Sequence, residues 1–138
     1  MKNKLTRNKM RIGTMINLIS LITFMLIWEL TAEKGNFLFF AVEAIAFIIF
    51  LASYIRMFWM TKLWKFIHLN IKKLDERDLK ITGYSLRFSY AAFSILVLSL
   101  LLYYSITEYS VGIIPVGALI YLAHIFPAYY LAWTEEIV

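Results

Sequence analysis

Four apolar runs dominate the chain, and each is long enough to cross a membrane as a helix. They lie at about residues 12–30, 37–59, 86–104 and 111–133. A helix rises 1.5 Å per residue, so about 20 residues match the ~30 Å hydrocarbon core of a bilayer. Hydrophobic residues make up 62% of the 138-residue chain, whereas soluble domains carry roughly 45–50%. The pattern predicts a single all-α domain, an integral membrane four-helix bundle.

The first apolar run also resembles the core of a signal peptide, because basic residues precede it. These are Lys2, Lys4, Arg7, Lys9 and Arg11. The run is longer than the roughly 7–15 residues of a usual signal-peptide core. We therefore interpret it as a retained first membrane helix.

Lys and Arg lie almost entirely on one side of the predicted bundle. Five precede the first run, eight lie from Arg56 to Arg87, and Lys34 alone lies in a short loop on the other side. Because Lys and Arg are enriched in cytoplasmic loops, we expect a multi-pass protein of the cell (cytoplasmic or inner) membrane with both termini and the connector in the cytoplasm. The aromatic residues expected at the cytoplasmic interface are Trp59, Trp64, Tyr84, Tyr129, Tyr130 and Trp133.

A polar connector, at about residues 60–74, separates the two apolar pairs. Its apolar residues recur at helical spacing, and Lys residues occupy much of the other side. A basic amphipathic helix of this kind is typical of a helix lying on anionic headgroups. We expect such a helix, with Trp64, Lys72 and Lys73 at the interface with the lipid bilayer. Asp75 is a suitable N-cap, which predicts a break near Leu74 and a new helix after it.

The charged triplet after the connector has two interpretations. Asp75, Glu76 and Arg77 are either docking residues for a cytoplasmic partner or a solvated helix start. Leu74-Asp75-Glu76-Arg77, followed by Ile81, Ser85, Ser89-Tyr90 and Phe93, resembles small bacterial multi-span membrane proteins of uncharacterised families, in which an Asp-Glu-Arg triplet precedes a membrane helix. The resemblance covers about 30 residues. It implies a small bacterial membrane protein and brings no activity or site residue.

Three polar residues within the apolar runs form the candidate intramembrane polar site. Glu43 lies roughly 9 Å inside the second run, and it is either a proton- or cation-handling carboxylate or a packed, hydrogen-bonded side chain. Asn17 shares a helix face with Ser20 and Thr23, and we expect this face to turn inward and bond across helices. His124, in the fourth run, is a haem ligand, a proton relay or a buried hydrogen-bonded histidine.

The sequence contains no pattern that points to catalysis. It has no cysteine, no phosphate-binding glycine loop, no His-Glu-x-x-His and no nucleophile elbow. Lipid-modifying enzymes can use few polar groups, so the sequence neither excludes catalysis nor supports it. The second histidine, His68, lies in the connector, too far in depth to pair with His124 on one haem. We expect no metal and no cofactor. We also expect no nucleic acid as a partner, because membrane orientation explains the net charge of +5.

Small residues on the third run indicate close helix approach. Ser85, Ser89, Ala92 and Ser99 fall on one stripe. This stripe and the basic connector favour a non-enzymatic polytopic membrane protein that acts by association, as an accessory subunit or a small homo-oligomer. The alternative hypothesis is a small proton- or ion-coupled transporter centred on Glu43.

Overall fold

The computed structural model describes residues 7–59, 61, 63, 70, 74–108 and 110–134. Over these ranges the chain forms α1 (Arg7–Lys34), α2 (Phe37–Tyr54), α4 (Glu76–Thr107) and α5 (Ile113–Thr134), and a π-helical turn, η1 (Ile55–Trp59), continues α2. Each of the four helices, with η1 counted in α2, is long and apolar enough to cross a membrane. The prediction of an all-α chain with four such helices is confirmed. The predicted connector helix lies largely outside the described residues.

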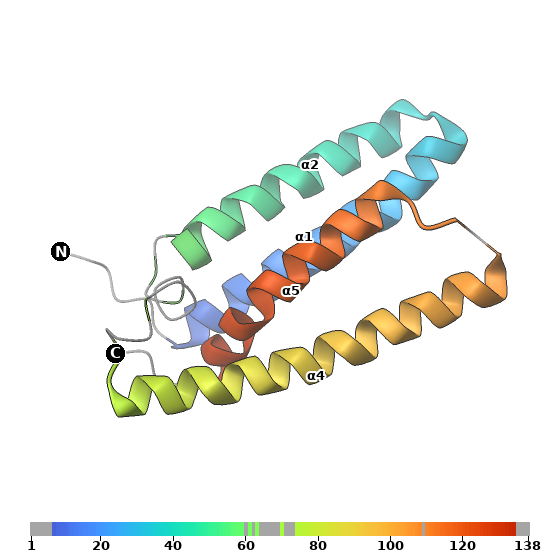
Figure 1. Cartoon of the computed structure of the whole chain (residues 1–138). Helices are drawn as coiled ribbons and strands as arrows, with labels where there is room; N and C mark the ends of the chain where they lie inside the picture. The colour runs from blue at the N-terminus through green and yellow to red at the C-terminus, as the bar shows by residue number, and fades with distance from the viewer. Residues whose placement is uncertain are drawn as a thin grey trace.

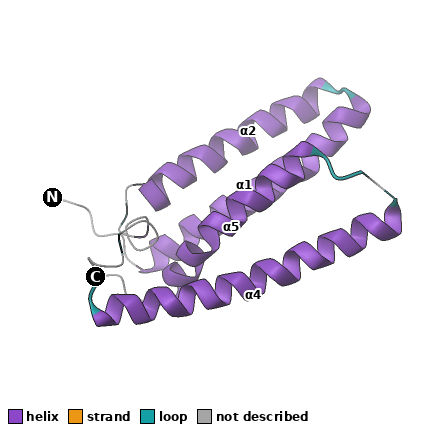
Figure 2. Cartoon of the chain, in the orientation of Figure 1, coloured by secondary structure: helices purple, strands orange, loops and turns teal. Residues whose placement is uncertain are grey.

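The helices form two antiparallel hairpins that share one long axis (Figure 1). We call the end where α1 begins and α5 ends the terminal end, and the opposite end, with the two short connections, the loop end. Helix α1 packs along α2 and also against α5, whereas α4 packs mainly against α5. Figure 2 shows the same all-helical arrangement, with α4 and α5 separating toward the loop end. Helix α4 is therefore the edge of the bundle.

Local signals in the sequence account for the helix ends. Gly35 adopts a left-handed φ of 57° after α1, a conformation that glycine accepts without steric cost. Asn36 then caps α2, and its side chain accepts a hydrogen bond from the Leu38 N–H at 3.0 Å. Asp75 caps α4 by accepting from the Asp78 N–H at 2.7 Å. The predicted helix start at Asp75 is confirmed.

The buried core is concentrated toward the terminal end. Its larger cluster consists of Met10, Met57, Phe58, Leu63, Ile125, Ala128, Leu131 and Ala132. A smaller cluster closer to the loop end contains Leu21, Ala118 and Leu122. In a membrane, lipid is as apolar as these side chains, so helices are held by close packing and by hydrogen bonds between them. The terminal half supplies most of that packing.

The small-residue stripe of α4 is divided between the inside of the chain and its surface. Ser85 and Ser89 are buried, and the Ser89 hydroxyl donates to the Ser85 carbonyl at 2.6 Å. Helix α5 lies against this part of α4, since the Phe88 and Tyr130 rings are 5.0 Å apart. Ser99, in contrast, is exposed. The first half of the stripe therefore serves packing within the chain.

Candidate functional site

Asn17 is the centre of a hydrogen-bond network that joins three helices. The side chain is fully buried. Its Nδ2 donates to the Phe50 carbonyl at 3.2 Å and to the Ser53 Oγ at 2.8 Å, both on α2. Its Oδ1 accepts from the hydroxyls of Tyr121, at 2.6 Å, and Tyr129, at 2.7 Å, both on α5. An amide has two donor hydrogens and two acceptor lone pairs, so all four positions of Asn17 are used.

Helical spacing places the two tyrosines on the same side of α5. They are eight residues apart, which separates them by about 80° around the helix and about 12 Å along it. Ser20 shares the buried face of α1, but its hydroxyl donates to the Asn17 carbonyl at 2.9 Å and so stays within the helix. The inward turn predicted for Asn17 and Ser20 is confirmed. Asn17 is the member of this pair that bonds across helices.

Aromatic rings enclose the network. Phe50 and Tyr121 meet edge to face with centroids 4.9 Å apart, and Tyr54 lies 5.9 Å from Tyr121. Phe58 packs against Tyr129 at 5.7 Å. Tyr129 was expected at the interface with the headgroups, but its hydroxyl reaches the Asn17 amide instead. An interior acceptor competes successfully with the interface because an unpaired amide oxygen inside the bundle is costly.

The network is suited to holding helices together rather than to chemistry. Its donors and acceptors are an amide, phenols and a hydroxyl. The Ser53 hydroxyl donates to the Phe50 carbonyl at 2.8 Å, so its proton points to a backbone oxygen and not to a base. Among the described residues, no group of three or more His, Asp or Glu side chains gathers as a metal site would require. The arrangement stabilises the contact of α1 with α2 and α5.

Two further contacts tighten the terminal end. The Arg11 guanidinium donates to the Trp133 carbonyl at 2.7 Å and lies 5.2 Å from the centre of the Trp133 ring, which joins the start of α1 to the end of α5. Two residues on, α1 approaches η1 through Gly13. A Cβ at Gly13 would lie 2.1 Å from the Met57 Sδ. Only glycine leaves room for Met57 here.

Glu43 lies on the same face of α2 as the network but nearer the loop end. Its side chain is 7% exposed, and its Oε2 is buried with no hydrogen-bond partner among the described residues. It shares the spacing of Ala46, Phe50 and Ser53, which places it on the side of α2 that faces α1.

Of the other predicted site residues, the structure describes His124, Asp75, Glu76 and Arg77. His124 is exposed on α5, which does not fit the alternative of a buried histidine. Five residues turn a helix by about 500°, which directs His124 about 140° away from Tyr129. Glu76 and Arg77 are exposed in the first turn of α4, beside the Asp75 cap. The remaining predicted interfacial residues, Trp64, Lys72 and Lys73, lie outside the described residues.

Ser53, Tyr121 and Tyr129 are the partners that the sequence interpretation did not assign to Asn17. The signal that points to them is chemical: an amide in an apolar run needs donors and acceptors from other helices. Ser53 is the polar residue at matching depth in the second run, and the spacing of the two tyrosines places them on the same side of α5. The pairing itself depends on how the helices rotate against one another, which residue types do not specify.

Comparison with models of protein families, with curated proteins and with solved structures finds no match to this chain. The resemblance to small bacterial multi-span proteins therefore stays a prediction. The function must be argued from the geometry of the chain itself.

Proposed function

We propose that this chain is a non-enzymatic multi-pass protein of the bacterial cell membrane that acts by association, with a second copy of itself as the partner. The observation that carries the proposal is the one-sided packing of α4. This helix packs mainly against α5 and exposes a long apolar face. The saturated Asn17 network supports a structural rather than a catalytic interior.

The charge distribution supports cytoplasmic termini. Basic residues of the described helices gather toward the terminal end, and they are Arg7, Lys9, Arg11, Arg56, Arg77, Lys80 and Arg87. Lys34, at the end of α1, belongs to the loop end. Under the positive-inside rule, the terminal end faces the cytoplasm. The charge-free part of α4, residues 88–107, then covers about 30 Å and matches the hydrocarbon core.

The exposed face of α4 has the spacing of a helix–helix seam. Ile95, Leu98, Leu102 and Ile106 follow one another by three or four residues, and each is more than half exposed, between 62% and 72%. The exposed Ser99 lies between them and permits close approach. An edge helix that packs on one side only offers the same surface in both copies, which a two-fold symmetric dimer requires.

Fluorescence energy transfer between labelled copies in liposomes tests the proposal. We expect wild-type protein to dimerise, and Leu98→Ala with Leu102→Ala to weaken dimerisation by about 1 kcal/mol or more, roughly fivefold. The matched control is Ile45→Ala with Ile48→Ala, which removes equally exposed side chains, 58% and 64%, from α2. Wild-type protein that stays monomeric, or equal weakening by both pairs, would overturn association through α4.

Glu43 motivates a second candidate, a proton- or ion-coupled transporter. The supporting observation is the buried Oε2 without a described partner, since ionisable groups within membrane helices are costly and often functional. The candidate predicts ion-dependent flux in reconstituted liposomes that Glu43→Gln abolishes. Wild-type liposomes with no flux above that of protein-free liposomes would exclude it.

A further inference from the structure

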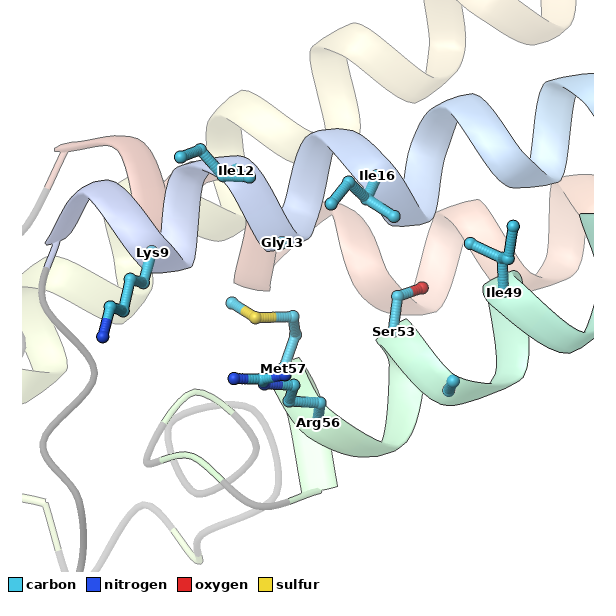
Figure 3. Close-up of a pocket in the computed structure, with 9 residues that line it drawn as sticks. Lys9, Ile12, Gly13, Ile16, Ile49, Ser53, Arg56 and Met57 are labelled. Carbon is cyan, nitrogen blue, oxygen red and sulfur yellow. The ribbon is translucent and has the colours of Figure 1, made fainter.

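A groove with two chemically different parts lies between α1 and the end of α2 (Figure 3). Its volume is about 450 Å³, within the roughly 300–1,000 Å³ that is usual for small-ligand sites. The lining residues are Lys9, Ile12, Gly13, Ile16, Ile49, Ala52, Ser53, Arg56 and Met57. The groove therefore combines aliphatic walls with two cations.

The two cations lie at the same end of the groove. Figure 3 shows the Lys9 ammonium and the Arg56 guanidinium near its terminal end, while Ile16 and Ile49 lie further along. No acidic side chain is among the described lining residues. The described lining of the groove therefore supplies two positive charges and no negative one.

The apolar part of the groove opens sideways from the bundle. Ile12 is 60% exposed, and Ile16 and Ile49 are each 44% exposed. In a bilayer, such a surface contacts acyl chains directly. The groove therefore offers an apolar track that a lipid can enter from the side and a cationic end at the depth of the headgroups.

The backbone gives the groove its floor. Gly13 lets the buried Met57 side chain lie against α1. Met57 and Arg56 both belong to the π-helical turn η1. Such turns occur frequently at functional sites, because the extra residue redirects side chains. Here the turn sends Met57 inward and leaves Arg56 exposed at the mouth.

We propose that this groove binds one anionic phospholipid of the leaflet at the terminal end. The phosphate lies between Lys9 and Arg56, and an acyl chain follows Ile12, Ile16 and Ile49. Basic pockets between membrane helices are a recognised way to bind anionic lipid headgroups. The described lining residues belong to α1, α2 and η1, and the site rests on the membrane placement proposed above. A free phosphate would use only the cationic end, so the apolar walls select a lipid.

Native mass spectrometry of the purified full chain in detergent micelles tests the site. Phosphatidylglycerol and phosphatidylcholine with identical acyl chains are titrated in parallel. We expect one phosphatidylglycerol to be retained with about 25-fold higher affinity than phosphatidylcholine, since two nearby cations each favour an anionic headgroup by roughly fivefold. Glycerol phosphate, which has the headgroup charge and no acyl chain, is expected not to displace it.

Matched variants locate the binding. Lys9→Gln with Arg56→Gln should reduce the preference for phosphatidylglycerol at least fivefold, whereas Arg77→Gln with Lys80→Gln, which neutralises exposed cations on α4, should leave it unchanged. Ala52→Phe fills the apolar part and should weaken both lipids. Equal affinity for the two lipids, equal loss in both charge variants, or displacement by glycerol phosphate would each overturn the proposal.

The outcome can be separated from that of the proposed function. A chain that is released from membranes by alkaline carbonate would remove the basis of both proposals. A chain that stays in the membrane, dimerises through α4 and shows no lipid preference would overturn the groove alone. A monomeric chain with the lipid preference would support the groove and reject the dimer.

Discussion

The contact of α1 with α2 contains two buried polar side chains in opposite situations. Toward the terminal end, Asn17 uses all four of its hydrogen-bonding positions. Glu43 lies seven residues before Phe50 on the same face of α2, about 10 Å closer to the loop end. Its Oε2 is equally shielded but has no partner among the described residues. These two buried side chains therefore differ in how many of their polar atoms have a hydrogen-bond partner among the described residues.

The space beside α1 near Asn17 also differs from the space toward the loop end. Near Asn17, Gly13 and Met57 leave no space for a single added carbon. Toward the loop end, an apolar cavity of about 230 Å³ lies between α1, α2 and α5, and Gly117 is one of the residues that line it. A Cβ at Gly117 would meet nothing within 4 Å. The contact of Gly13 with Met57 is thus closer than any contact at Gly117, although the groove of about 450 Å³ opens beside Gly13.

Asn17→Leu should give the largest loss of stability, because it removes all four hydrogen bonds and leaves the two tyrosine hydroxyls without their acceptor. Hydrogen bonds between membrane helices contribute about 0.6 kcal/mol each on average, so we expect a loss of about 2–3 kcal/mol. Unfolding by SDS in mixed micelles, followed by circular dichroism, measures it. Ile19→Leu, on the exposed face of α1, is the control. A loss equal to that of the control would show that the network does not hold the helices.

Gly13→Ala should be the next largest effect, at about 1–2 kcal/mol, because overpacking forces Met57 out of its position. The same substitution at Gly117 meets open space and should be neutral or stabilise by up to about 1 kcal/mol, since alanine favours the helix. Both are read by the same SDS titration. Combining Gly13→Ala with Met57→Ala should remove most of the Gly13 penalty, and if the penalty persists the close approach does not cause it.

Much of the fold is readable from the residues because the signals are local. Run length and apolarity define four helices, and the Asp75 cap marks the start of α4. Asn17 could be placed on an inward face because Asn17, Ser20 and Thr23 are polar residues spaced three apart in an apolar run. These inferences need the properties of one helix at a time, and the structure agrees with them.

Features that depend on how the helices are rotated against one another could not be predicted from the sequence. Whether Tyr129 faces headgroups or Asn17 depends on the rotation of α5 against α1. The exposure of His124 follows from the same rotation. That the Oε2 of Glu43 has no partner among the described residues depends on which α1 residues lie opposite. The groove at Lys9 and Arg56 likewise depends on how α1 lies against α2 and η1. Apolar helices fit one another in several rotations, and the fit is decided by packing across the interface.

Tyr121→Phe and Tyr129→Phe should each have a smaller effect than Asn17→Leu, about 0.6–1 kcal/mol, because each removes one of two donors to the same oxygen. The double variant leaves Asn17 Oδ1 with no donor from α5 and should cost more than the sum of the single variants. SDS unfolding of the four proteins completes the cycle, with Tyr103→Phe, exposed on α4, as control. Strict additivity would mean that the two tyrosines do not share one acceptor.

Glu43→Gln should have the smallest effect. Glutamine keeps the shape of the side chain and cannot ionise, and no described hydrogen bond to Oε2 is lost. We expect the free energy of unfolding in the SDS titration to change by less than about 0.5 kcal/mol, the usual range where no specific interaction is removed. A loss approaching that of Asn17→Leu would show that Glu43 has a hydrogen-bond partner. Asn17 and Glu43 would then not differ in this respect. A small change would mean that the chain folds without a carboxylate here, so that any cost of burying Glu43 is tolerated for a reason other than the stability of the bundle.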